Sequence, residues 1–172
     1  MAERRSSETM ITTASSTPSL LPSHVSLEEV LEVIRGGMPG SSVAEITLLE
    51  KRQPDVAVAT SQVTSRGLAI PYRELGDPRL DAFQRHVVNR IDSTRTDARW
   101  PEFCHHATAT GVHSIISIPL VFAGGALGAL SLYSETEAAF GDRTERAGVV
   151  FAALASAIVR IGRRPSALGG RW

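Results

Sequence analysis

The sequence predicts an α+β domain with a largely antiparallel sheet, and three observations support this class. β-like runs follow one another directly along the chain, and amphipathic helical patterns lie toward both ends. The short segment "AGG" separates two apolar runs, as in a β-hairpin. Finally, the sequence lacks the regular alternation of strands and helices of a doubly wound fold, and it has no glycine-rich phosphate loop.

Composition narrows the class of protein. The 172 residues suit one domain with a tail, and 18 basic residues balance 18 acidic ones. This balance argues against a general nucleic-acid or membrane-surface binder, which carries a basic excess. The single cysteine excludes an intramolecular disulfide and zinc motifs built on cysteine pairs. Without a membrane-spanning run or a secretory signal, we expect a cytoplasmic protein that requires no metal.

The first elements are a tail, a helix and a hairpin. Residues 1–25 are rich in Ser and Thr, so we expect a disordered tail that cannot offset its ordering entropy. Ser26 and Glu29 have the spacing of a capping box, and the helical pattern that follows stops at the glycines 36–37. Two β-like runs then flank a turn that contains Pro54 and predict a hairpin.

The middle of the chain is less regular. Residues 64–84 contain scattered Gly and Pro and predict loops around short helical turns, which suit the lining of a site. Residues 86–92 predict a third strand. Pro101 suits the first position of a short helix, which Gly111 would end.

The last part carries the strongest signals. Residues 113–122 and 126–134 flank the "AGG" turn and predict a hairpin. Asp142 and Glu145 predict a second capping box, followed by a helix of about eighteen residues. The apolar stripe of this helix consists of Ala147, Val150, Phe151, Leu154, Ile158 and Ile161. Residues 163–172 predict a flexible basic tail.

The stretch from Arg99 to Arg160 resembles a GAF domain, and more narrowly the actinobacterial GAF domains often joined to RNA-binding ANTAR modules. The resemblance is carried, in this order, by "RWPEF", "GVHSIISIPL", "GGALGALSLYS" and "AAFGD". Upstream, "ITLL" and "VAVATS" are similar to the first two strands of the family. The predicted GAF-like domain therefore covers residues 26–162.

The resemblance implies a PAS-related fold with five or six antiparallel strands, terminal helices on one face and a ligand pocket on the other. It also implies a non-enzymatic sensory or regulatory protein that binds a small molecule. Its terminal helices would signal to a partner, as in transcriptional regulation, and they often form a dimer seam. Because the chain ends at Trp172, we expect no ANTAR module and an output through a separate protein or a homodimer.

The sequence departs from the family ahead of the third strand. Relatives usually carry a Gly-Glu-Gly-Pro-Cys-like run there, whereas this chain has "YRELGDPRLDA" with Arg79 or Leu80 at the cysteine position. The recognition made by that loop in relatives therefore does not transfer.

Cys104, His105 and His106 admit several interpretations. Adjacent histidines on a helix point to different sides, so they cannot hold one metal together. A nucleophilic thiol needs an oriented base, for which no signature is present, and the GAF reductases of free methionine sulfoxide use several cysteines. Bilin- and haem-binding GAF domains use a Cys-His pair or a histidine in this region. A tetrapyrrole sensor therefore stays open as an alternative, beside an ordinary, partly buried cysteine and a purely structural dimerisation module.

Aromatic and polar residues near the predicted pocket are the candidates for ligand binding. Trp100 and Phe103 suit a pocket wall, although packing of the short helix explains them equally. Asp92 is a turn cap or a pocket residue, and Ser114 and Ser117 lie on opposite strand faces, so only one faces a cavity. The full candidate set is Tyr72, Asp92, Trp100, Phe103, His106 and Ser117.

The last helix is apolar over more than half of its surface, which predicts that it is covered on two sides. We therefore expect a homodimer through the terminal helices. The candidate dimer residues are Leu27, Leu31, Val150, Leu154 and Ile158. The arginines near its C-terminal end suit the helix dipole and solvation, and they lack interleaved aromatics and a basic face. Together with the balanced charge, this makes neither nucleic acid nor a membrane an expected partner.

Overall fold

The computed structural model describes residues 26–50, 53–59 and 76–162. They form a five-stranded antiparallel sheet with strand order β2-β1-β5-β4-β3, which confirms the predicted fold class. The elements are α1 (Leu27–Gly37), β1 (Val43–Glu50), β2 (Gln53–Ala59), α3 (Pro78–Arg85), β3 (Asn89–Ile91), α4 (Pro101–Ala109), β4 (Ser114–Phe122), β5 (Gly125–Ser134) and α5 (Asp142–Gly162). The predicted tails and Tyr72 lie outside the described residues.

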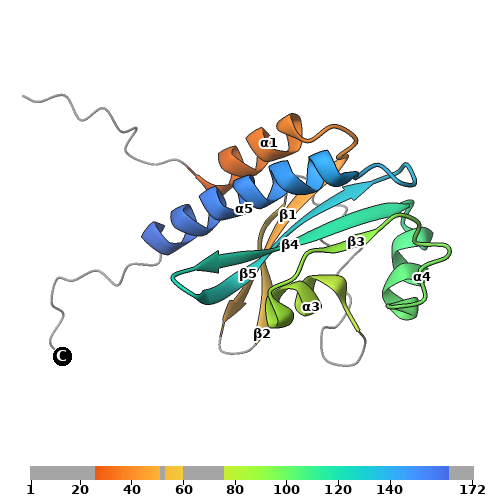
Figure 1. The fold of residues 1–172 in the computed structure, drawn as a ribbon, viewed down its shortest axis with the longest axis horizontal. Coiled ribbons are helices and arrows are strands. Elements are labelled where there is room, and N and C mark those ends of the chain that lie inside the picture. The colour runs from red at the N-terminus through yellow and green to blue at the C-terminus, as the bar shows by residue number, and fades with distance from the viewer. Residues whose placement is uncertain (1–25, 51–52, 60–75, 163–172) are drawn as a thin grey trace, which may run out of the picture.

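Helices α1 and α5 lie side by side on one face of the sheet, and α3 and α4 lie on the other (Figure 1). Alternation along the strands assigns the side chains to these faces. In β4, Ile116 and Ile118 join the core beneath α1 and α5, whereas Ile115 joins a second cluster around α4. The molecule therefore has two distinct interiors, separated by the sheet.

Two local signals read from the sequence are confirmed. The backbone N–H of Glu29 donates to Ser26 Oγ over 3.2 Å, and the Ser26 N–H donates to Glu29 Oε2 over 3.0 Å, which forms the capping box of α1. Ala123 and Gly124 turn the β4–β5 hairpin with φ values of 50° and 80°. Positive φ at two consecutive turn residues matches the twist of the paired strands.

Helix α5 packs on the sheet through small residues. Its buried positions include Gly148, Ala152 and Ala155, so the helix axis approaches the strands closely. Half of the predicted apolar stripe lies against the core, where Ala147, Phe151 and Ile158 pack at its edge. The other half is exposed, with Val150 at 69%, Leu154 at 54% and Ile161 at 67%. The exposed half of the stripe leaves an apolar surface on this helix.

Three further predictions are corrected. The loop region predicted over 64–84 contains helix α3, and the strand predicted over 86–92 is only the three residues of β3. Asp142 does not cap α5 from outside but is its first residue, and its carboxylate accepts a hydrogen bond from Arg90.

Among the described residues, no helix combines the length and the apolar character needed to cross a bilayer.

Candidate functional site

A row of buried polar side chains crosses the sheet face opposite α1 and α5. The strand register pairs Glu45 with Ser131, Ser131 with Ser117, and Ser117 with Asn89. The four residues therefore form one line from β1 through β5 and β4 to β3, which we call the polar row. Each of them is at most 6% exposed. A sheet face that served only for packing would carry apolar residues here, as the opposite face does.

Helix α3 covers the polar row with its first turn. Asp77 is its N-cap and Pro78 its first residue, a combination that starts a helix without a lost hydrogen bond. Asn89 Nδ2 donates to the Pro78 carbonyl oxygen over 2.8 Å. The start of α3 is thus fixed to the row, and the next residue, Arg79, enters the interior.

Arg79 is the charged centre of this interior, with 1% of its surface exposed. Its Nε lies 2.9 Å and 3.1 Å from the two oxygens of Asp77, and its Nη1 donates to Glu45 Oε1 over 3.1 Å. The guanidinium also lies 5.4 Å from the ring centroid of Phe103 on α4. Burial lowers the pKa of Arg79, but the interactions with Tyr133, Asp77 and Glu45 outweigh it and raise this pKa further, so the group stays charged.

Glu45 is only half satisfied within the described residues. Its Oε1 accepts hydrogen bonds from Arg79 and, over 2.7 Å, from Thr47 Oγ1. Its Oε2 is buried and has no hydrogen-bond partner there. A buried acceptor left unpaired costs about 1–3 kcal/mol, and more when the group is charged. The polar row therefore lowers the stability of the fold, and such a local loss of stability is typical of a functional site.

The other side chains of the row, Ser117, Ser131 and Asn89, are themselves neutral. Ser117 and Ser131 lie 3.0 Å apart through their hydroxyl oxygens. Asn89 Nδ2 also lies 3.0 Å from Asp81 Oδ2, within α3. Hydroxyl and amide groups can serve as donors or acceptors, so they adapt to either partner type. The row therefore offers one carboxylate together with neutral groups that accept or donate hydrogen bonds.

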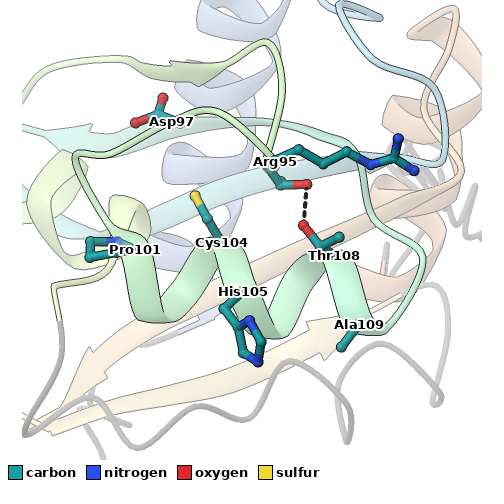
Figure 2. A pocket seen from close by; sticks show the side chains of 8 residues that line it. Arg95, Asp97, Pro101, Cys104, His105, Thr108 and Ala109 are labelled. Atoms are coloured by element: carbon teal, nitrogen blue, oxygen red, sulfur yellow. Dashed lines mark hydrogen bonds between the residues drawn. The ribbon is translucent and has the colours of Figure 1, made fainter.

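A cavity of about 470 Å³ lies beside α4 (Figure 2). It is lined by Thr94, Arg95, Asp97, Pro101, Cys104, His105, Thr108 and Ala109. Thr108 Oγ1 donates to Thr94 Oγ1 over 2.8 Å, which ties α4 to the loop between β3 and α4. In Figure 2 the Cys104 sulfur points toward the side of Asp97, whereas the His105 ring projects from the other side of the helix. Thiol and imidazole therefore do not form a pair.

The chemistry of Cys104 is that of a protonated thiol. Burial, followed by the charge of Asp97, raises its pKa to about 11, and Arg99 offsets only part of this. A thiol that is protonated at neutral pH is a poor nucleophile. In the described part of the chain, no group of three or more His, Cys, Asp or Glu residues is arranged to hold a metal ion.

Side chains connect the wall of this cavity to α5. Asp97 pairs with Arg99, whose Nη2 donates to the backbone oxygen of Arg90. The Arg90 side chain then donates to Asp142 over 2.9 Å and to Glu145 over 3.4 Å, both in the first turn of α5. The chain of contacts runs from the loop before α4 to the helix on the opposite face of the sheet.

Comparison with known proteins identifies the family. The family model described as "GAF domain" matches residues 24–160. This chain belongs to the GAF domain family. GAF domains are in general sensory and signalling domains that bind small molecules, and the topology described above agrees with this membership. A search of curated proteins found no match to this sequence.

Solved structures share the fold of this GAF domain at low sequence identity. A domain of a sensor histidine kinase from Sinorhizobium meliloti is 16% identical with a TM-score of 0.63, and 81% of this chain and 94% of that one are covered. The type II free methionine-R-sulfoxide reductase of Thermoplasma acidophilum is 15% identical with a TM-score of 0.63, covering 78% and 89%. The GAF domain of the cyanobacteriochrome TePixJ is 10% identical with a TM-score of 0.61, covering 77% and 85%. These similarities show the fold alone.

The residues predicted for ligand binding are spread over the GAF domain. Ser117 lies in the polar row, and Phe103 lies beside Arg79 above it. Trp100 is 8% exposed and packs in the α4 cluster, with the Arg99 guanidinium 4.5 Å from its ring. Asp92 points outward, with Oδ1 3.2 Å from Arg90 Nε. His106 is half-buried, and its Nε2 has no partner in the described ranges.

Sequence reasoning missed Glu45, Arg79, Asn89 and Ser131, which complete the polar network. The sequence did contain one signal for helix α3. Asp77 followed by Pro78 is the combination of N-cap and first helical residue that starts a helix. The row itself depends on the register of four strands, which no local pattern specifies.

Proposed function

We propose that this chain is a cytoplasmic, non-enzymatic sensory GAF domain that binds a small molecule on the sheet face of the polar row. The observation that carries the proposal is the polar row itself, which Arg79 and Phe103 cover. Buried polar groups and ion pairs stabilise a fold less than well-packed apolar residues do, so their retention favours a binding role. The low reactivity of the Cys104 thiol supports a binding role over a thiol-based catalytic one.

The ligand would act through the terminal helices. The contacts from Asp97 through Arg99 and Arg90 reach Asp142 at the start of α5, so a shift of the loop before α4 changes the seating of that helix. A separate output protein, or a second copy of this chain, would read the change. The resemblance to GAF domains that accompany ANTAR modules favours an output in transcriptional regulation.

The dimer surface of the proposal is the apolar groove between α1 and α5. This groove has a volume of about 210 Å³ and is lined by Glu29, Val30, Val33, Ile34, Phe151, Leu154 and Ile158. Of its lining residues, Val33 and Leu154 are more than half exposed, and so is Val150 on α5. Of the other predicted seam residues, Leu27 packs at the edge of the core, and Leu31 is fully buried and takes no part in the surface.

A second copy of this chain is the proposed occupant, because α1 and α5 form one continuous apolar surface that a symmetric partner can match with its own. Leu154→Glu should convert the homodimer to a monomer in sedimentation velocity. Val87→Glu, which adds the same charge at an exposed apolar residue outside the groove, should leave it dimeric. A wild-type protein that is monomeric at high concentration would contradict this part of the proposal.

Native mass spectrometry of the purified chain tests ligand binding. We expect one small molecule per chain, or a rise in melting temperature with a compound from a metabolite library. Ser117→Ala should weaken binding, because it removes a hydroxyl of the row. Ser41→Ala, which removes a hydroxyl bonded only to the nearby Val43 carbonyl among the described residues, should not. A chain that carries no ligand and responds to none would instead be a structural dimerisation module.

A tetrapyrrole sensor is the second candidate, and one observation favours it. Cys104 lines the cavity beside α4, and a cyanobacteriochrome GAF domain is among the proteins with this fold. Expression with bilin or haem supplied should then give visible absorbance that Cys104→Ala or His106→Ala removes. A colourless protein under both conditions would exclude this candidate.

A further inference from the structure

The charges of the polar row and of the residues of α3 that cover it do not balance within the described residues. Arg79 carries one positive charge and faces two carboxylates, Asp77 and Glu45. Asp77 uses both of its oxygens on Arg79, and it also accepts from the backbone N–H of that residue over 2.8 Å. One negative charge therefore remains in a fully buried environment, and it lies on Glu45.

The geometry locates the excess on one atom. Glu45 Oε1 is held by Arg79 and Thr47, while Oε2 has no hydrogen-bond partner in the described part of the chain. The Glu45 side chain is 0% exposed, so bulk water does not reach it. A carboxylate oxygen in this setting is stabilised best by a donor that also carries positive charge, because charge-assisted hydrogen bonds are about twice as strong as neutral ones.

We propose that Glu45 makes this site selective for a ligand with a cationic N–H donor, that is, a protonated primary amine, an amidine or a guanidine. The inference rests on the proposed ligand-binding function and names its chemical class. Glu45 Oε2 accepts the N–H of the ligand, and Ser131, the register partner of Glu45 on β5, carries the nearest hydroxyl of the row along the strand pairing. Phe103, close to Arg79, supplies an aromatic surface for the apolar part of the molecule.

The alternative is an anionic ligand bound by Arg79, and the contacts disfavour it. Nε, Nη1 and Nη2 of Arg79 already face carboxylate oxygens of Asp77 and Glu45. An anion would join two carboxylates in a buried space, where like charges repel strongly. Cation selectivity follows from this count.

Benzamidinium, benzamide and benzoate test the proposal, because they share one shape and differ in charge and donors. With the full-length chain, we expect benzamidinium at millimolar concentration to raise the melting temperature, and the two analogues to leave it unchanged. Glu45→Gln should weaken benzamidinium binding by about 10–100-fold, the equivalent of a charged hydrogen bond. Glu102→Gln, which neutralises an exposed glutamate on α4, should bind as the wild type does.

The ligand-free Glu45→Gln variant gives an independent readout. Its side-chain oxygen can still accept from Arg79 and Thr47, while the unpaired anionic oxygen is gone. Its melting temperature should therefore equal or exceed that of the wild type. A strong decrease would overturn the proposal, since Glu45 would then be fully satisfied by the fold.

The outcomes separate this inference from the proposed function. Equal binding of all three probes, or binding that Glu45→Gln leaves intact, overturns cation selectivity while ligand binding stands. Absence of benzamidinium binding alongside a retained molecule in native mass spectrometry has the same meaning. Absence of both overturns the two proposals together.

Discussion

Arg90 Nη1 donates to Oδ1 of Asp142 over 2.9 Å and thereby joins the edge strand β3 to the first residue of α5. Arg90 also accepts, through its backbone oxygen, a hydrogen bond from Arg99 in the loop before α4. One residue therefore contacts both the loop that lines the α4 cavity and the helix on the far face. This relationship makes Arg90 a positioning residue. Its substitution tests the contact between the loop before α4 and helix α5 separately from the stability of the whole fold.

Arg90→Gln should change the free energy of unfolding by less than about 1 kcal/mol, because partly exposed ion pairs contribute little. Amide hydrogen exchange in the first turn of α5 should nevertheless become faster, since the turn loses its contact with β3. Arg35→Gln, which breaks the exposed pair with Glu32 inside α1, is the matched control and should leave α5 unchanged. Unaltered exchange in Arg90→Gln would contradict the coupling.

The same contact predicts a dependence of stability on acid. The hydrogen bond and charge of Arg90 lower the pKa of Asp142, and Arg99 lowers the pKa of Asp97 although burial opposes it. A carboxylate whose pKa is lower in the folded state adds stability above its unfolded pKa of about 3.9, and this stability disappears as the pH falls further. Urea unfolding across this range should show a smaller acid-induced loss in Arg90→Gln than in the wild type. Equal slopes would contradict this.

Arg79→Met should destabilise the chain by about 3–5 kcal/mol, because it leaves the carboxylates of Asp77 and Glu45 buried without their counter-charge. Adding Glu45→Gln to this variant should restore part of the loss. Arg85→Met is the control on the same helix, since its side chain is 70% exposed, and it should cost less than about 1 kcal/mol. Chemical denaturation measures all three, and an equal cost at both arginines would refute the buried role.

Gly128→Ala should disrupt the pairing of β1 and β5. A Cβ at this position would lie 2.9 Å from the Cα of Leu48 and closer still to the Thr47 carbonyl oxygen, and neither backbone atom can move independently. We expect a loss of more than about 3 kcal/mol or failure to fold. Gly36→Ala meets nothing within 4 Å and lies in α1, so it should be neutral or stabilise by up to about 1 kcal/mol. Thermal unfolding compares the two, and similar melting temperatures would contradict the close approach.

Cys104 should react slowly with iodoacetamide in the native protein. With a pKa of about 11, its thiolate fraction near pH 8 is roughly 200-fold below that of an ordinary thiol with a pKa near 8.5. Mass spectrometry reports this residue alone, because the chain has one cysteine. The urea-unfolded chain is the control and should react at the ordinary rate. The raised pKa also means that the folded state loses stability as the pH rises above about 8.5.

The sequence predicts best those features that depend on neighbouring residues. Ser26 and Glu29 define the start of α1, and Ala123-Gly124 defines the hairpin, because each acts within one turn of chain. Helix α3 escaped prediction because its buried residues include Arg79 rather than an apolar stripe. The second capping box failed because Arg90, distant in sequence, binds the carboxylate of Asp142.

The candidate site was harder to predict than the fold for a physical reason. Ser117 was found because it lies on a strongly patterned strand, but its neighbours come from other strands. Glu45 resembles, in its local sequence, one polar residue of a half-exposed strand, whereas in the fold it is buried and bonded to Arg79 of α3. Its importance arises from tertiary contacts, which local spacing does not encode.

The polar row also guards against misassembly of the sheet. If β1 slipped by one residue against β5, Glu45 would turn toward the apolar interior beneath α1, and Ile46 would face the guanidinium of Arg79. Such a misaligned chain would expose apolar side chains and bury an unpaired carboxylate, so it would aggregate and would not form a stable fold. Substitutions that make the row apolar should therefore lower the yield of correctly assembled protein even where they leave the final structure more robust.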